Sequence, residues 1–276
     1  MVPKRPYACL AAVPHSGRKV LPMRAATGPR ALIVNADDWG CDRRTTNAIF
    51  DCFQCGAISS VSAMLFMQDS ERGAEIAREQ GIDAGLHLNL TTPFSAALTP
   101  PPLAEHQQRI SRHLSRNRFA PAVFHPGLIR SFEYVVAAQL DEYARLYGIP
   151  AGRIDGHHHM HLSANVVFST LLPAGSVMRR NFSFRAGERP FCNRLYRKFV
   201  DGMIGRRYRL TDLFYSLTPL EPAQRLREIF LQARLRVVEV ECHPARTEER
   251  AFLAGGRFFC SLEEAQIAGP AKHHLV

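Results

Sequence analysis

The sequence contains no apolar run approaching the ~18–20 residues that a helix needs to cross a bilayer, so no transmembrane segment is expected. It has little cysteine: seven residues, an odd number, with no spacing that suggests a disulfide framework. Cys52 and Cys55 form a Cys-x-x-Cys, but no second pair follows to complete a zinc ribbon, and we expect buried thiols in a helix. This pattern fits the reducing cytoplasm.

Acidic residues are scarce in two parts of the chain. The first thirty residues carry six lysines and arginines and no acid, and residues 179–236 hold 14 Lys/Arg against 5 Asp/Glu, within a net charge of +10. A basic flank is typical of proteins that contact nucleic acid, an acidic substrate or a membrane surface, and the alternative is a solvated arginine-rich surface. No base-reading motif accompanies the charge, so we expect no nucleic-acid partner.

The chain of 276 residues is long enough for one large α/β domain. Residues 1–29 lack the apolar core of ~7–15 residues that a secretory signal requires. We expect a disordered basic extension there, with Met23 as an alternative beginning. Residues 30–265 are expected to form the single domain, and residues 266–276 a flexible tail.

Strand-like apolar runs alternate with helix-like amphipathic runs from Arg30 onward. The expected strands are 31–35, 58–66, 83–90, 153–159, 175–179 and 236–242. The expected helices are 43–55, 70–80, 132–147, 165–172, 190–206 and 221–233. Residues 93–126 are rich in proline and polar residues, and we expect a loop or insertion with short helices. The alternation predicts parallel strands joined by right-handed crossovers.

Polar residues recur where the expected strands end, at positions spread over more than 200 residues of the chain. A (β/α) barrel collects its active site at such a rim, whereas an open doubly wound sheet gathers ligands at one switch point. Four contributing strands therefore favour a single-domain, barrel-like α/β fold, distorted or with fewer than eight regular strands. An open doubly wound sheet is the alternative.

Two neighbouring carboxylates, Asp37 and Asp38, follow the first expected strand within Asn-Ala-Asp-Asp-Trp-Gly at 35–40. Their side chains point in different directions, so one can bind a metal while the other faces the substrate water. Carboxylates this close repel each other unless a cation lies beside them. An exposed turn is the alternative, but the preceding strand and the histidines elsewhere favour a divalent-metal hydrolase.

Histidines supply the second half of this pattern. His157, His159 and His161 alternate within Asp-Gly-His-His-His-Met-His at 155–161, and they share one face if the segment is extended. His87 lies in an otherwise apolar strand, where a buried imidazole needs a partner and a cation supplies one. Neutral imidazole is the commonest metal ligand at neutral pH. A histidine-rich surface loop and a structural His87 are the alternatives.

The last expected strand adds a further histidine. Glu239, Glu241 and His243 share one of its faces by the period of two, and Pro244 then stops the strand's hydrogen bonding. A histidine at this rim that does not bind the metal itself can serve as a general acid.

Together these segments resemble the YdjC-like (ChbG/HpnK) carbohydrate deacetylase family, over roughly residues 30–260. The segments that carry the resemblance are 35–40, Gly-Leu-His-Leu-Asn-Leu at 85–90, 155–161 and Cys-His-Pro at 242–244. Each is weak alone, but the four in this order are specific. Trp39 stands where the family commonly has Phe, and neither residues 93–126 nor the arginine-rich region matches a motif of the family.

The resemblance implies a barrel-like α/β fold and the hydrolysis of N-acetyl groups on sugars with one divalent cation, Mg²⁺ or Zn²⁺. Taken position by position, it implies that Asp38, His87 and His157 bind the metal. It also implies Asp37 as the general base, and His243 as the acid or a substrate-binding group. The cation in such a hydrolase lowers the pKa of a bound water and stabilises the oxyanion that forms.

Four more residues, Asp155, His159, His161 and Arg179, are candidates for supporting the ligands from behind or for contacting substrate. The expected partner is an N-acetylated sugar, free, polymeric or lipid-linked, and a homodimer is compatible with the sequence. The basic region suggests a substrate that carries phosphate or carboxylate, with Arg179 or Arg180 near the pocket. The alternatives are another metal hydrolase, a phosphoesterase or amidohydrolase, and a catalytically silent sugar- or metal-binding protein.

Overall fold

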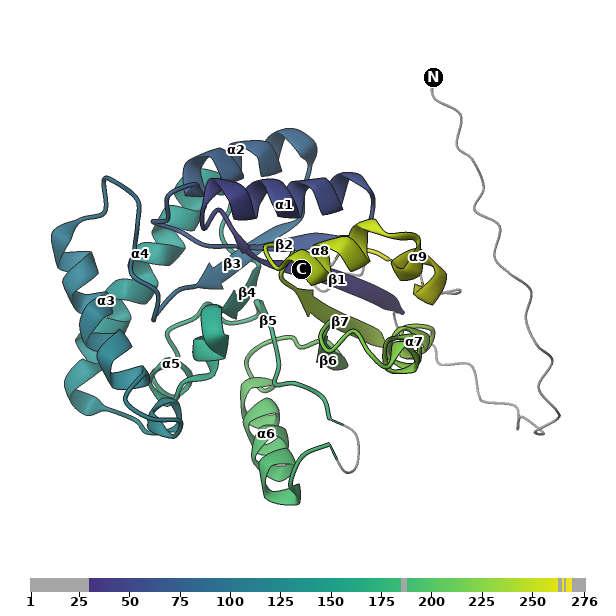
Figure 1. Ribbon diagram of the computed structural model, residues 1–276. Helices are drawn as coiled ribbons and strands as arrows, with labels where there is room; N and C mark the ends of the chain where they lie inside the picture. Colours follow the sequence, from purple (N-terminus) through teal and green to yellow (C-terminus); the bar gives the residue numbers. More distant parts are fainter. Residues whose placement is uncertain (1–29, 185–187, 263–264, 266, 270–276) are drawn as a thin grey trace, which may run out of the picture.

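Figure 1 shows the computed structural model, which describes residues 30–184, 188–262, 265 and 267–269. The expected extension at 1–29 and most of the expected tail at 266–276 lie outside the described residues. Within them, seven parallel strands form one sheet in the order β5-β4-β3-β2-β1-β7-β6. The strands are β1 (Ala31–Trp39), β2 (Ser60–Ala63), β3 (Ala84–Leu88), β4 (Arg153–Gly156), β5 (Val177–Met178), β6 (Leu213–Ser216) and β7 (Val237–Cys242).

Helices connect the strands and surround the sheet (Figure 1). They are α1 (Arg43–Gln54), α2 (Ser70–Gln80), α3 (Pro101–Leu114), α4 (Ile129–Tyr147), α5 (Ala164–Phe168), α6 (Phe191–Ile204), α7 (Ala223–Gln232), α8 (Thr247–Ala254) and α9 (Gly256–Leu262). Short 3-10 helices are η1 (Ala120–Ala122), η2 (Pro126–Leu128) and η3 (His157–Leu162). Among the described residues, no helix is both long and apolar enough to cross a membrane.

The strand order identifies the sheet as a curled half-barrel. Starting at β1, the neighbours on one side are β2, β3, β4 and β5 in chain order, and on the other side β7 and β6. A doubly wound sheet would instead reverse its direction at a switch point. At the open side, a parallel bridge joins Val177 to Arg209, shortly before β6, and the Ser183 N–H donates to the Phe214 carbonyl at 2.7 Å. The predicted barrel-like α/β fold with fewer than eight regular strands is confirmed.

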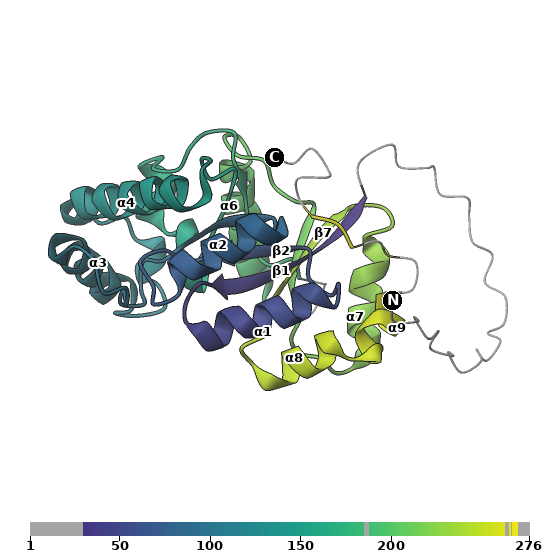
Figure 2. The same cartoon turned by 90° about the horizontal axis from the view of Figure 1, so that it is seen from above.

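Side-chain alternation along β1 separates an apolar outer face from a polar inner face. Leu32, Val34 and Ala36 are buried in a core shared with α1, α7, α8 and α9, and Figure 2 shows α1 and α8 side by side on this side of β1. Asn35 and Asp37 alternate with them and are buried as well. Because successive strand residues face opposite sides, these two polar side chains point into the half-barrel.

Helix ends follow the signals in the sequence. The Asp42 side chain caps α1 by accepting a hydrogen bond from the Thr45 N–H at 2.9 Å. Gly81 and Gly148 end α2 and α4 with φ values of 63° and 74°, a left-handed conformation that a residue without Cβ adopts readily. The helices predicted at 70–80 and 132–147 therefore end where expected.

Residues 93–126 hold more regular structure than expected. They include the 14-residue helix α3, whose first turn accommodates two prolines because the first N–H groups of a helix have no partner within it. Leu103, Ile110 and Leu114 are buried at helical spacing along it. The strand β6 and the helices α8 and α9 were not predicted either.

The two cysteines of the Cys-x-x-Cys differ in burial. Cys52 is fully buried beside Ile49 in the core under α1, which confirms the expectation for that thiol. Cys55 is exposed, so the expectation is wrong there, because α1 ends at Gln54 and Cys55 caps it away from the buried face.

The histidine-rich segment is not the continuous strand that was predicted. β4 ends at Gly156, and η3 follows at once. His158 and His159 have φ values of 54° and 58°, so the chain turns through the left-handed region instead of staying extended. The predicted shared face of His157, His159 and His161 is therefore wrong.

Gly156→Ala is expected to lower the free energy of unfolding by about 1–3 kcal/mol, because its Cβ would lie 2.8 Å from the His161 backbone nitrogen and force β4 or η3 to shift. Urea denaturation measures this change. Gly202→Ala is the matched control, since a Cβ there meets nothing within 4 Å and alanine favours a helix by about 0.5–1 kcal/mol. Equal stability of the two variants would contradict the packing described for Gly156.

Candidate functional site

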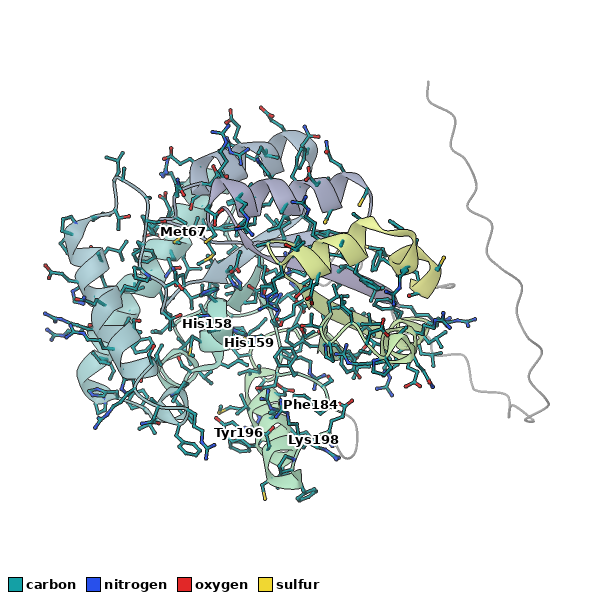
Figure 3. All side chains as sticks on the ribbon, in the orientation of Figure 1. Met67, His158, His159, Phe184, Tyr196 and Lys198 are labelled. Carbon is teal, nitrogen blue, oxygen red and sulfur yellow. The ribbon has the colours of Figure 1, made fainter. Side chains whose placement is uncertain are left out.

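The carboxyl ends of β1, β3, β4 and β7 surround a cavity of about 320 Å³. The residues that line it are Asp37, Asp38, Gly156, His157, His158, His159, Glu241, His243 and Arg246, together with His87. Figure 3 shows His158 and His159 near the middle of the molecule, inside the ring of helices. Because parallel strands end at the same edge of a sheet, segments far apart in the sequence contribute to one site.

Three potential metal ligands converge at this cavity. The Nδ1 atom of His157 lies 2.9 Å from Oδ1 of Asp38, and Nε2 of His87 lies 3.4 Å from the same oxygen. One ligand atom from each of the three residues lies within 4.8 Å of the other two. Asp38 reaches this position with a φ of 70°, which turns it out of the regular path of β1.

The contacts within this group fit a cation better than they fit hydrogen bonds. Oδ1 of Asp38 is buried and has no hydrogen-bond partner among the described residues, although two imidazole nitrogens lie beside it. An orphaned buried carboxylate oxygen is costly, and a bound cation would satisfy it. Two imidazoles and one carboxylate are also a donor set that binds transition metals in proteins. The residues present therefore fit a divalent metal ion.

Asp155 orients His87 from behind. Its Oδ1 lies 2.6 Å from Nδ1 of His87, on the side of the ring opposite Nε2, and its Oδ2 accepts a hydrogen bond from Ser62. A carboxylate on the far nitrogen fixes the tautomer and the orientation of a metal-binding histidine. Asp155 is fully buried and does not line the cavity.

The pKa values at this group reflect the balance of burial and charge. Burial raises the pKa of Asp38, but the adjacent His157 and His87 outweigh it, and the pKa falls well below its usual value. Burial lowers the pKa of His87, but the charges of Asp37 and Asp155 outweigh it and raise the pKa to about 10. The carboxylates and imidazoles of this group thus stabilise the charged forms of one another.

Arg179 is the counter-ion of the acids behind the cavity. Its guanidinium donates to Asp37 at 2.7 and 2.8 Å and to Glu239 at 2.7 Å, and it lies 3.0 Å from Asp155 and 3.4 Å from Glu241. Only 2% of Arg179 is exposed. Its nitrogens are thus directed at acids of the protein, and Arg179 is not among the residues that line the cavity.

Asp37 remains able to accept one more hydrogen bond. Its Oδ1 accepts from Asn35 at 2.8 Å and from Arg179, and among the described residues its Oδ2 accepts from Arg179 alone. A carboxylate offers about four acceptor sites, so one remains on Oδ2. Burial opposes its charge, but Arg179 prevails and lowers the pKa of Asp37, which is therefore ionised at neutral pH.

A second acidic and imidazole group, Asp37, His87 and Asp155, also has the spacing of a metal site. The guanidinium of Arg179 lies against both of its carboxylates, at 2.7 to 3.0 Å. A cation placed there would meet this fixed positive charge, so the group of Asp38, His87 and His157 is better suited to a cation.

His243 follows directly after β7. Its backbone N–H donates to Glu249 at 2.6 Å, which fixes the start of the loop. Its Nδ1 is buried and has no hydrogen-bond partner among the described residues. His243 itself is one of the residues that line the cavity.

The other histidines of η3 take different positions. His159 lines the cavity, with Nε2 3.7 Å from Glu241, and burial together with Arg179 lowers its pKa to about 3. His161 is turned away from the cavity, and its Nε2 donates to the Arg179 carbonyl at 2.9 Å. His158 lies beside Thr91, with 3.0 Å between Nδ1 and the hydroxyl.

Sequence reasoning did not single out His158 or Arg246, although both line the cavity. Nothing in the sequence marks the left-handed turn that exposes His158, since neither it nor His159 is a glycine or asparagine. Arg246 follows Pro244 and belongs to the loop before α8, a helix that was not predicted. Arg180, the other arginine expected near the pocket, instead pairs with Asp201 at 2.9 Å.

Comparison with known proteins identifies relatives of this chain. The model of a family described as YdjC-like protein matches residues 31–268. A carbohydrate deacetylase from Danio rerio is 29% identical over 168 residues, which are 59% of this chain and 52% of that protein. A chitooligosaccharide deacetylase from Yersinia pestis (strain Pestoides F) is 30% identical over 135 residues, 48% of this chain and 51% of that protein. The chain thus spans about half the length of these curated relatives.

A solved structure resembles this one over most of its length. It is a crystal structure at 1.70 Å of a protein from Enterococcus faecalis V583 that is named for cellobiose-phosphate cleavage. The TM-score is 0.63 at 18% sequence identity, and the match covers 89% of this chain and 99% of that one. At this identity the likeness shows a shared fold and nothing about shared chemistry.

Arg179→Met is expected to lower the free energy of unfolding by about 3–5 kcal/mol, because it leaves buried carboxylates without their counter-ion. Arg145→Met is the matched control, since Arg145 pairs with Glu142 and Glu71 at the surface and such pairs contribute at most about 1 kcal/mol. Urea denaturation at neutral pH measures both. A loss for Arg179→Met no larger than that of the control would disprove its role as the central counter-ion.

Proposed function

The chain belongs to the YdjC-like protein family, and from this premise we propose that it is a metal-dependent carbohydrate deacetylase. The reaction is the hydrolysis of an N-acetyl group on an amino sugar, which releases acetate and leaves the free amine. One observation carries the proposal: Asp38, His87 and His157 converge on a single point of the cavity, and the ionised Asp37 stands beside them with an open acceptor site.

Asp38, His87 and His157 would hold the metal ion. When bound, such an ion acts as a Lewis acid that polarises the acetyl carbonyl and makes water a better nucleophile at neutral pH. Two imidazole nitrogens among three ligands favour Zn²⁺ over Mg²⁺, which prefers an all-oxygen set. Asp155 supports this choice, because it orients His87 as a nitrogen ligand.

Asp37 and His243 would move the protons. Asp37 takes the proton of the attacking water at Oδ2, and Arg179 holds the carboxylate in place while this happens. His243 also lines the cavity and protonates the leaving amine. The role of each residue matches what the family resemblance implies for its position.

The substrate class follows from the relatives and the shape of the site. Curated relatives are named for carbohydrates and chitooligosaccharides. The cavity of about 320 Å³ accommodates one sugar unit with its acetamido group, and it is lined mainly by polar side chains. We therefore propose an N-acetylglucosamine-containing saccharide. The low cysteine count, with no spacing that suggests a disulfide framework, supports a reducing compartment such as the cytoplasm.

A phosphoesterase is the less supported alternative. Many phosphoesterases use two metal ions about 3.5–4 Å apart, which requires more carboxylate ligands than one ion does. The other carboxylates close to the cavity, Asp37, Asp155 and Glu241, all lie within 3.4 Å of the Arg179 guanidinium. This arrangement supports one cation site at the cavity, in the part of the chain that is described.

Asp37→Asn is expected to reduce acetate release by about 10²–10⁴-fold, because asparagine cannot accept the proton of water. The bound metal should be retained, since the three ligands are unchanged. Asp42→Asn is the matched control: it makes the same chemical change at the cap of α1, where asparagine serves as well as aspartate. Acetate released from N-acetylated chitooligosaccharides is the readout, and near wild-type turnover of Asp37→Asn would refute the assignment of the base.

Metal binding is expected to depend on the three ligands. After chelation and reloading with Zn²⁺, the wild-type chain should retain about one ion, as a site of this kind does. Asp38→Ala and His157→Ala should weaken binding by more than about a hundredfold and abolish acetate release. His106→Ala is the control, because His106 contacts Ser131 away from the cavity. Metal content measured by mass spectrometry tests this, and two ions per chain would count against the single site.

A further inference from the structure

The helix α6 (Phe191–Ile204) carries an apolar face toward solvent. Val200 and Ile204 are buried and attach the helix to the core. Phe191, Leu195 and Phe199 repeat every four residues and therefore share a face, and they are 71%, 56% and 66% exposed. A surface helix of a globular protein normally presents polar residues there. In Figure 1, α6 projects from the edge of the domain.

The surroundings of this face are strongly basic. Residues 188–209 hold seven lysines and arginines against two acids. One of the acids, Asp201, is buried and accepts hydrogen bonds from Arg180 and Asn181, so it points into the domain. Lys198 and Arg194 lie along one side of the apolar stripe by helical spacing, and Figure 3 shows Lys198 at its surface. The outward side of α6 is therefore apolar, with positive charge along one edge.

Aromatic contacts link α6 to the cavity of the candidate site. Arg197, on the inner side of α6, stacks on Phe184 at 5.1 Å. The Phe184 ring lies 6.2 Å from that of Phe182, and Phe182 packs edge-on against His159 at 4.7 Å. The helix is thus attached to a lining residue of the cavity through two aromatic side chains.

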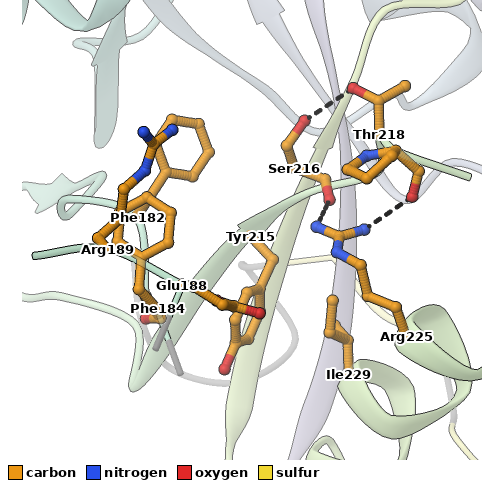
Figure 4. A pocket seen from close by; sticks show the side chains of 11 residues that line it. Phe182, Phe184, Glu188, Arg189, Tyr215, Ser216, Thr218, Arg225 and Ile229 are labelled. Carbon is orange, nitrogen blue, oxygen red and sulfur yellow. Dashed lines mark hydrogen bonds between the residues drawn. The ribbon is translucent and has the colours of Figure 1, made fainter. Parts of the chain in front are cut away.

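A second pocket, of about 380 Å³, lies along this connection. Figure 4 shows Phe182, Phe184 and Arg189 on one side of it, across from Arg225 and Ile229. Apolar surface therefore extends from the start of α6 toward the strand ends of the sheet.

We propose that α6 docks on a bilayer surface that contains anionic lipids. The apolar stripe enters the boundary between headgroups and acyl chains, as an amphipathic helix lying in the interface does. The flanking lysine and arginines reach the lipid phosphates while their stems lie along the apolar surface.

The charge and the apolar area of this face favour a lipid bilayer over a second copy of the chain or a nucleic acid. A second copy of the chain on α6 would bring two basic surfaces together, which disfavours a dimer through this face. A nucleic acid would match the charge but would leave three large apolar side chains without a partner. An anionic lipid surface satisfies both features. The docking is independent of the proposed deacetylase reaction, since no residue of the cavity takes part in it.

Flotation with vesicles tests the proposal on the full-length, metal-loaded protein. We expect the wild-type chain to float with vesicles of phosphatidylcholine mixed with phosphatidylglycerol, and much less with phosphatidylcholine alone. The triple variant Phe191→Ser, Leu195→Ser and Phe199→Ser should reduce partitioning to the anionic vesicles by at least about tenfold, because it removes the apolar area that enters the interface.

Two further variants keep the test specific. Leu98→Ser with Ile149→Ser removes apolar side chains that are 92% and 62% exposed elsewhere on the surface, and it should float like the wild type. Arg194→Glu with Lys198→Glu should lose the preference for anionic lipid. Circular dichroism and acetate release from a water-soluble chitooligosaccharide should be unchanged in all variants, so loss of docking is distinguishable from loss of the enzyme.

Several outcomes would overturn the proposal. Wild-type protein that stays unbound to anionic vesicles, or a triple variant that floats as well as the wild type, rules out docking through α6. A dimer in sedimentation that the triple variant abolishes, without vesicle binding, assigns the face to a second copy. Retention of an oligonucleotide without vesicle binding assigns the basic surface to nucleic acid.

Discussion

The polar interior of this half-barrel depends on one buried guanidinium. Arg179, just after β5, reaches Asp37 on β1, Asp155 on β4, and Glu239 and Glu241 on β7. Without it, four buried carboxylates would face one another in a medium that screens charge poorly. The same contacts connect the two arms of the curled sheet on the side where the backbone pairing between β5 and β6 is sparse. The ion pairs of Arg179 thus link the two arms of the sheet where few backbone hydrogen bonds do so.

The residues of the site form two layers, one buried behind the cavity and one that lines it. Arg179 fixes Asp155 and Asp37, and Asp155 in turn fixes the ring of His87. Of these four residues, His87 and Asp37 line the cavity, whereas Asp155 and Arg179 lie behind them. Side chains held by buried partners lose little conformational freedom when a ligand binds, so the geometry of the cavity is set before the substrate arrives.

The fold and the strand-end residues could be predicted from sequence because they follow local rules. Continuous apolar runs gave the parallel strands, and parallel strands place Asp38, His87 and His243 at one edge. The path of η3 could not be predicted, because it depends on tertiary contacts that hold His158 in a left-handed conformation. For Arg179 the sequence left two roles open, support of the ligands from behind or contact with substrate. Only the packed structure reveals the four internal acids around it.

Backbone strain is concentrated in the residues that line the cavity. Of the five described residues other than glycine with positive φ, three line the cavity: Asp38, His158 and His159. Each such conformation costs about 1–2 kcal/mol for an L-amino acid. Glycine at any of them would relax the main chain but would remove a side chain that lines the cavity. Selection for thermal stability alone would therefore favour glycine at these three positions. At this edge of the cavity, stability and activity impose opposite requirements on the sequence.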